Sequence, residues 1–333
     1  MSIKIGREPF VGVGIEGTPG IAVAASKYLP FVTCTIRGMQ EPIVDEAAKG
    51  VRERVWGAVQ GPKHGEGDIE IYADAENAAY LLYAALGTVS STTASGESAV
   101  YEHTITRKTS NPPRSMTVIY NDTQDTRKYT YATVNTLEFN VSDGLATISA
   151  NFLSKFPTSG TGTQAVTEER VLAFKDYNIK FGSGATGTAA LADAAGNSAT
   201  PVRSFTLRIN NNAEVQYLSG DNDAAQVSWG QLEIEGEYVL FYENTTDRVH
   251  YETLLNGSDP VTAMIVTFTG DSIGTVPSNE QIEIRIPNFH LSDRATDTSI
   301  SGFITESPTF VAEYDPDETK SIQIKITNTT ANY

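Results

Sequence analysis

The sequence predicts a mainly β, α+β fold that consists of two tandem copies of one β-sandwich or barrel domain, each with a flanking α-helix. About a dozen segments alternate polar and apolar residues with the period of two that is typical of strands. Only two sizeable segments have helical spacing, and each of them directly follows a strand. This strand-helix unit occurs twice, once in each half of the chain. We therefore expect one domain over residues 1–160, with an extended N-terminal arm, and a second over 161–333.

The first strand-helix unit spans residues 67–87. Its strand, Asp68-Ile69-Glu70-Ile71, alternates as a strand with one solvated face should. Asp74 offers a carboxylate at the start of the helix, and Gly87 supplies a C-terminal stop. Its apolar residues lie nearly all round the helix, which suits a helix covered on several sides. The expected packing residues are Leu81, Leu82 and Leu86.

The second unit begins at Gly236, the counterpart of Gly67. Its strand leads into an expected helix over residues 245–255, where Leu254 and Leu255 are the corresponding packing residues. The only two tryptophans, Trp56 and Trp229, each precede a glycine, and they are separated by nearly the same length of chain as Gly67 and Gly236. Gly257 is the stop that follows the second helix. The sequence separation between Gly87 and Gly257 is also nearly that between Gly67 and Gly236. Three landmarks at nearly constant spacing indicate a duplication.

The other elements follow from alternation and from glycine and proline breaks. Residues 1–28 read as an extended arm, and residues 38–64 as a long loop of the kind that usually has a function. Residues 158–163 read as the linker between copies, and Ser183 to Ala199, rich in small residues, as a mobile surface loop. The further expected strands are 31–36, 101–106, 115–120, 129–141, 145–152, 171–174, 177–181, 205–209, 232–242, 262–269, 281–286, 303–314 and 321–327.

The net charge of −17 is divided unevenly, with −3 in residues 1–160 and −14 in residues 161–333. So acidic a chain does not bind DNA by neutralising its phosphates, although it could surround DNA and repel it. No run of 18 apolar residues is present, so no membrane partner is expected.

The sequence shows no pattern typical of an enzyme. The four histidines, His64, His103, His250 and His290, lie far apart and lack metal-ligand spacing. No nucleophile-elbow, zinc-protease or phosphate-loop motif occurs. Cys34 lies in an apolar segment and is interpreted as a buried, inert thiol. We expect no catalytic residue, no metal and no cofactor.

Glu233, Glu235 and Glu237 alternate along one expected strand, so their carboxylates share a face. This face is either an ordinary solvated sheet surface or a surface that faces a polyanion without binding it. The second interpretation makes these residues the candidates for a lumen lining.

Several segments together resemble the tail tube proteins of long, non-contractile bacteriophage tails. The first copy is similar at residues 13–20, at Tyr28-Leu29-Pro30-Phe31 and in the strand-helix unit that ends at Gly87. The second copy is similar at residues 204–212, at Trp229-Gly230, at residues 235–238, at Arg285-Ile286-Pro287 and at residues 312–315. Each motif is short, and it is their order over most of the chain that carries the resemblance.

The resemblance implies a structural protein of the virion tail, the major tail tube subunit. Most members of the family have one tube domain and stack as hexameric rings, so two fused copies imply a trimeric, pseudo-hexameric ring. Stacked rings would conduct phage DNA through the lumen without specific binding. The implied partners are further copies of the chain and the tape measure, terminator and baseplate proteins, and the implied locations are the virion and, during assembly, the host cytoplasm.

Two alternatives stay open from the sequence. A baseplate or tail-completion ring of related fold would share the same domain. A two-domain β-sandwich that binds carbohydrate, or an adhesin, is left open by the 15 tyrosines, although a repeated strand-helix unit is unusual in such sandwiches.

Overall fold

A computed structural model of the chain describes residues 6, 8–47, 49–50, 52–167, 169–183, 187–241, 262–275, 278–297 and 302–333. Two large antiparallel sheets contain most of the described strands, and only short helices accompany them. The mainly β, α+β class predicted from the sequence is confirmed. Within the described ranges, no helix is long and apolar enough to cross a membrane.

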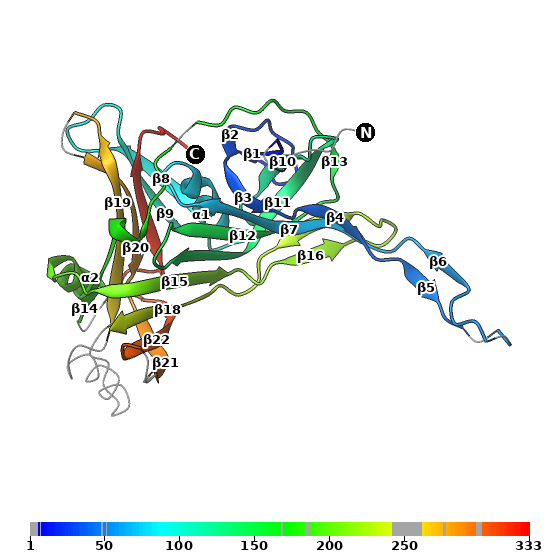
Figure 1. Cartoon of the computed structure of the whole chain (residues 1–333). Helices are drawn as coiled ribbons and strands as arrows, with labels where there is room; N and C mark the ends of the chain where they lie inside the picture. The colour runs from blue at the N-terminus through cyan, green and yellow to red at the C-terminus, as the bar shows by residue number, and fades with distance from the viewer. Residues whose placement is uncertain are drawn as a thin grey trace.

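The larger sheet contains a row of eight strand positions that passes through both halves of the chain (Figure 1). The row begins with β3 (Phe31–Cys34) and β4 (Arg37–Gln40), which share one position, and continues through β7 (Lys63–Tyr72), β12 (Thr147–Ser154), β11 (Thr126–Val141), β15 (Val202–Asn210), β18 (Glu233–Phe241), β22 (Thr305–Ala312) and β21 (Phe289–Asp297). All neighbours are antiparallel. The two halves join where β11 pairs with β15.

The first part of β11 extends beyond this row and carries a smaller group of strands. β10 (Met116–Asn121) pairs with β11, β1 (Phe10–Ile15) pairs with β10, and β2 (Lys27–Leu29) pairs with β1. The short β13 (Thr158–Ser159) pairs with the opposite edge of β11. The N-terminal arm is therefore held against the first half of the chain from β1 onward.

The second sheet also combines strands from both sides of residue 160. Its order is β14 (Tyr177–Gly182), β19 (Ala263–Ile273), β20 (Ser278–Ile286), β23 (Gln323–Asn328), β9 (Tyr101–Arg107) and β8 (Gly87–Thr93). A short 3-10 helix, η1 (Phe174–Asp176), precedes β14. The two halves of the sequence thus share both sheets.

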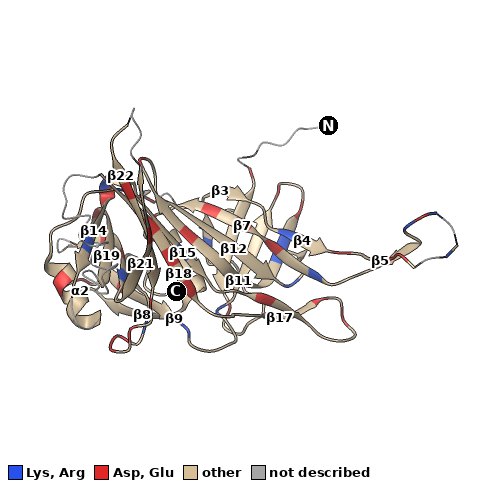
Figure 2. Cartoon of the chain, turned by 90° about the horizontal axis from the view of Figure 1, so that it is seen from below, with Lys and Arg blue, Asp and Glu red and all other residues tan. Residues whose placement is uncertain are grey.

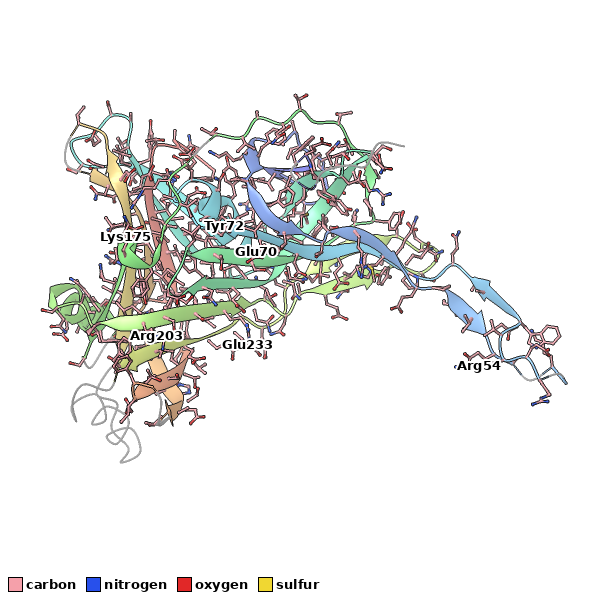
Figure 3. The ribbon with its side chains drawn as sticks, viewed as in Figure 1. Arg54, Glu70, Tyr72, Lys175, Arg203 and Glu233 are labelled. Carbon is pink, nitrogen blue, oxygen red and sulfur yellow. The ribbon has the colours of Figure 1, made fainter. Side chains whose placement is uncertain are left out.

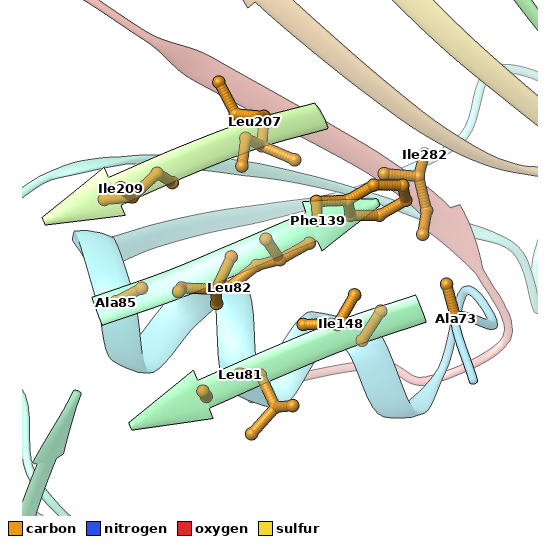
Figure 4. Close-up of a cluster of buried hydrophobic side chains, with 14 of the residues drawn as sticks. Ala73, Leu81, Leu82, Ala85, Phe139, Ile148, Leu207, Ile209 and Ile282 are labelled. Atoms are coloured by element: carbon orange, nitrogen blue, oxygen red, sulfur yellow. The ribbon is translucent and has the colours of Figure 1, made fainter. Parts of the chain in front are cut away.

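Helix α1 (Asn77–Leu86) lies between the two sheets, and all ten of its residues are buried. The Asp74 carboxylate accepts hydrogen bonds from the backbone N–H groups of Glu76 and Asn77, at 3.0 and 2.6 Å, and Gly87 ends the helix in the left-handed conformation. Leu81 and Leu82 are fully buried, and Leu86 is almost so. Figure 4 shows the side chains from α1, β11, β12, β15 and β20 that meet in this core.

Helix α2 (Gly187–Gly196) corrects the expectation of a mobile loop over residues 183–199. Alanine is the strongest helix former, and Ala190 and Ala194 pack with Leu191 against Ala263 and Ile265 of β19. The helix also has a cap, because the backbone N–H of Gly187 donates to Asp315 at 3.0 Å. The helix expected over residues 245–255, with Leu254 and Leu255, lies outside the described residues.

Two hairpins extend from the same end of the larger sheet. β5 (Ile43–Asp45) and β6 (Gly57–Val59) form the longer one, which projects well away from the body (Figure 1). β16 (Glu214–Tyr217) and β17 (Ala224–Ser228) form the shorter one, which lies beside the base of the first. The loop expected over residues 38–64 is therefore an extended hairpin.

Candidate functional site

One face of the larger sheet is open and acidic, whereas its other face is covered by α1 and the second sheet. Glu233, Glu235 and Glu237 lie exposed on the open face of β18, and Ile234 and Tyr238 on the same strand are buried. The structure thus places the three predicted carboxylates together on one face, as their spacing requires.

Pairing across the strands adds carboxylates that are distant in sequence. Glu70, Ser149, Glu138, Arg208 and Glu235 lie opposite one another in successive strands, from β7 to β18. We define the acidic face as Glu66, Asp68, Glu70, Glu138, Glu233, Glu235 and Glu237. Figure 2 shows acidic residues spread over the strands of this sheet, and Figure 3 places Glu70 and Glu233 on it.

Neighbouring polar side chains hold the carboxylates at the β7 end of the acidic face. Thr33 donates to Glu70 at 3.2 Å, and the Asn151 amide donates to Asp68 at 2.9 Å. These donors are uncharged, so they orient the carboxylates without neutralising them. The face therefore keeps its negative potential at Asp68 and Glu70.

Arg208 is the basic side chain at the centre of the acidic face. Its guanidinium group donates to Glu138 on β11 at 2.8 Å and to Glu235 on β18 at 3.4 Å. The hydrogen bond to Glu138 raises the pKa of Arg208 above its already high value, so the arginine stays charged. One cation shared by two carboxylates leaves the centre of the face with a net negative charge.

The two long edges of the row are open to a partner. In the described part of the chain, β3 and β4 pair only with β7, and β21 pairs only with β22. Val32 is 41% exposed on the first edge, and Ala295 is exposed on the second. Open edges of this length invite pairing with another chain.

The β5–β6 hairpin carries apolar side chains into solvent. Ile43, Trp56 and Val59 are 57%, 48% and 65% exposed. An isolated two-stranded hairpin is marginally stable in water, so this one is suited to packing against a partner. Arg54, near its tip, lies far from Lys175 and Arg203 at the other end of the sheet (Figure 3).

A mainly apolar groove of about 440 Å³ lies at that other end. Phe174, Tyr177, Val202 and Phe241 line it, and Lys175 and Arg203 add positive charge. The molecule therefore has an exposed apolar projection at one end of the sheet and an apolar depression at the other.

The buried polar groups act as structural ties. Glu16, from the segment 13–20 singled out in the sequence, is 1% exposed. Its carboxylate accepts hydrogen bonds from the backbone N–H groups of Gly20 and Tyr131, at 2.6 and 3.0 Å, and from the hydroxyls of Ser115 and Thr117, at 2.7 and 2.9 Å. The carboxylate thereby fastens the arm to β10 and β11.

The three histidines that the structure describes do not converge. His103 is buried beside the C-terminal residues, His64 lies within hydrogen-bonding distance of Tyr217, and His290 lies beside Glu313. His250 lies outside the described residues. Among the residues with described positions, no three metal-binding side chains form a cluster.

Cys34 is partly buried, and desolvation raises the pKa of its thiol to about 11. The thiol is therefore protonated at neutral pH, as an inert cysteine should be.

Sequence patterns alone missed two members of the site. The polar–apolar alternation of β11 predicts which face Glu138 lies on. Its position near Glu235 depends on β15, which pairs with both β11 and β18. Arg208 lies in a predicted strand, yet nothing in its own segment indicates two carboxylate partners.

Comparison with known families supplies the identity. A family model described as "Phage tail tube protein" matches residues 6–303, which is most of the chain. No curated protein sequence matches the chain significantly. The chain therefore belongs to the phage tail tube protein family, and it is a structural, non-enzymatic component of the phage tail that polymerises.

Proposed function

We propose that three copies of this chain form one pseudo-hexameric ring of the tail tube, and that stacked rings form the hollow conduit for phage DNA. In this proposal the chain is the major tube subunit and consists of two tube domains, residues 1–160 and 161–333. The observation that carries the proposal is an internal repeat in the larger sheet.

The two halves of the row have the same strand order. The first half reads β3/β4, β7, β12, β11, and the second reads β15, β18, β22, β21. In each half a hairpin lies between the first and second strands in sequence: β5–β6 in the first and β16–β17 in the second. Such agreement supports duplication of one domain.

The irregularities of the strands also correspond. The pairing of β3 with β7 shifts between Phe31 and Thr33, and that of β15 with β18 shifts between Val202 and Ser204. The pairing of β11 with β12 shifts between Val134 and Thr136, and that of β21 with β22 shifts between Leu291 and Asp293. Because bulges are specific features of a fold, their coincidence supports common descent of the halves.

A glycine faces an aromatic residue at the same place in each half. Gly67 lies opposite Phe152, and Gly236 lies opposite Phe310. A Cβ added at Gly67 would come within 2.4 Å of the Ile36 backbone, and one at Gly236 within 2.4 Å of the Thr206 carbonyl oxygen. Both positions therefore require glycine for the same steric reason, and they are the pair that begins the repeated strand-helix unit in the sequence.

Ring closure follows from repeating the junction between the halves. Within the chain, β11 of the first half pairs with β15 of the second. The same kind of junction between chains would join β21 to the β3/β4 edge of the next copy. With eight strand positions per chain, three chains would form a closed wall of 24 strands. Closure at six domains matches the hexameric rings that the resemblance implies.

The wall would have the acidic face inside. The second sheet and α1 cover the opposite face of the row, so they would lie outside the wall. Glu233, Glu235 and Glu237 would then line the lumen with the other carboxylates of the face. Like-charge repulsion, screened over about 8 Å at physiological salt, would let DNA pass without adhering.

Stacking would use the two ends of the subunit. The β5–β6 hairpin of one ring would pack into the groove near Phe174 and Phe241 of the next. The N-terminal arm, residues 1–28, is the other stacking element expected from the sequence, but β1 and β2 pair within the chain, so the hairpin is the stacking element of this proposal. The tape measure, terminator and baseplate proteins would be the partners at the tube interior and ends.

Electron microscopy of the purified chain tests this proposal. We expect open tubes of stacked rings with three-fold symmetry. Single closed rings would favour a baseplate or tail-completion component, and monomers at high protein concentration would contradict polymerisation by this chain alone.

A further inference from the structure

We propose that β21 of one copy pairs antiparallel with the β3–β4 edge of a second copy in a defined register, with Ala295 opposite Arg37. This inference rests on the proposed ring and specifies the contact that closes it. The pairing of β11 with β15 inside each chain is the template.

The first step equates β21 with β11. Both strands have a bulge against the preceding strand of the row, between Val134 and Thr136 in β11 and between Leu291 and Asp293 in β21. Aligning the bulges makes Asp293 the counterpart of Thr136. Two residues further along the strand, Ala295 is then the counterpart of Glu138.

The second step equates the β3–β4 edge with β15. Aligning the bulges makes Thr33 the counterpart of Ser204, and four residues later Arg37 is the counterpart of Arg208. An independent pairing agrees with this alignment. Arg37 lies opposite Glu66 of β7, just as Arg208 lies opposite Glu235 of β18.

The third step transfers the register. Inside the chain Glu138 lies opposite Arg208, so between chains Ala295 should lie opposite Arg37. Likewise Thr136 lies opposite Asn210, so Asp293 should lie opposite Met39 of the neighbouring copy. In the transferred ladder, residues 293–297 of one chain pair with residues 35–39 of the next.

The two edges are suited to this contact. Arg37 and Ala295 are both exposed, and neither strand has a second neighbour within the parts of the sheet that the structure describes. The inter-chain junction differs from the internal one at the position of Glu138, where Ala295 has no carboxylate, and at the pair Thr136–Asn210, whose counterpart is Asp293–Met39. In the closed ring, Arg37 would lie directly opposite the carboxylate of Glu66 in its own chain. The carboxylate of Asp293 in the neighbouring chain would be its diagonal cross-strand neighbour.

Disulfide trapping tests the register. In a Cys34→Ala background, Arg37→Cys combined with Ala295→Cys places two thiols directly opposite, within the Cα distance that a disulfide accepts. After mild oxidation of assembled tubes, we expect covalent dimers and trimers on a denaturing gel that revert to monomers on reduction. Glu138→Cys with Arg208→Cys should form the matching bond inside one chain and stay monomeric on the gel.

A shifted pair provides the counter-test. Ala295→Cys with Thr33→Cys moves one thiol four residues along the edge and should give no covalent trimer. Trimers from the shifted pair, or tubes without cross-links from the matched pair, would overturn the register while leaving the tube intact. If the matched variant fails to assemble, a side-chain-resolved electron cryomicroscopy map of the unmodified tube tests the register instead. A different strand beside β21 in that map, or a different register, would also overturn the inference. Failure of the unmodified chain to form rings would instead refute the proposed function.

Discussion

Arg208 on β15 donates a 2.8 Å hydrogen bond to Glu138 on β11, and this contact links the two halves of the chain across the centre of the acidic face. It lies on the strand pair that joins the halves. The same arginine also reaches Glu235, so one side chain ties three neighbouring strands together.

Removing this pair should have a small effect on stability. Both side chains are substantially exposed, and exposed ion pairs contribute about 1 kcal/mol or less. We expect Arg208→Ala and Glu138→Gln each to lower the free energy of unfolding by no more than about 1 kcal/mol. A double-mutant cycle in urea should give a coupling energy that shrinks as salt is added, whereas a large, salt-insensitive coupling would show that the junction depends on this pair.

His103 should make the fold sensitive to mild acid. Desolvation lowers the pKa of this buried histidine. Its Nε2 lies 2.8 Å from the Thr330 carbonyl oxygen, a geometry that fits a neutral ring donating a hydrogen bond from Nε2. The unfolded chain therefore takes up a proton at higher pH than the folded chain, and stability falls as the pH drops through the unfolded pKa of about 6.5.

Chemical unfolding at about pH 7.5 and about pH 5 checks this prediction. The unmodified chain should lose more unfolding free energy between these conditions than His103→Gln does. His290→Gln is the matched control, because the His290 side chain is only partly buried, and it should behave like the unmodified chain. Equal losses in all three proteins would contradict a role for His103.

The β5–β6 hairpin should be needed for stacking but not for folding. Its apolar residues are exposed in the single chain, so replacing Trp56 and Val59 by serine removes no internal packing of the body. We expect Trp56→Ser with Val59→Ser to give folded protein with an unchanged melting temperature that forms rings or short stacks in place of long tubes. Val166→Ser, which also removes an exposed apolar side chain, should form normal tubes. Long tubes from the hairpin variant would exclude it as a stacking element.

Reversing charge on the acidic face should make the tube retain DNA. We expect Glu233→Lys, Glu235→Lys and Glu237→Lys together to produce tubes that bind duplex DNA, with an affinity that falls steeply with salt. The unmodified tube should not bind. A control with Glu102, Asp125 and Asp317 changed to lysine has the same net charge, but those carboxylates lie off the acidic face. Electron microscopy should show bound DNA only where its ends enter the lumen. This result would show that DNA binds in the lumen and not on the outer surface of the tube.

Local patterns were sufficient for the elements whose signals lie within a few residues. Asp74, the apolar run to Leu86 and Gly87 define α1 without reference to the rest of the chain. The alternation of Glu233, Glu235 and Glu237 placed them correctly on one face. Helix α2 was missed because its alanines and glycines read as a loop, whereas burial of Ala190 and Ala194 against β19 favours the helix.

The rest depends on contacts that local sequence does not specify. The pairing of β11 with β15, and hence the position of Glu138 beside Arg208, depends on which strands meet after folding. The corresponding bulges of the two halves are visible only in the register of paired strands. The spacing from Gly67 to Gly236 indicated the repeat, and the steric need for glycine at both positions supplies its physical reason.

Electron cryomicroscopy of the assembled, unmodified tube tests the central claim most directly. We predict rings of three chains, a continuous inner wall in which β21 of each chain lies beside β3 and β4 of the next, and Glu233, Glu235 and Glu237 directed into the lumen. Rings of six chains, or a wall with these glutamates on its outer surface, would contradict it.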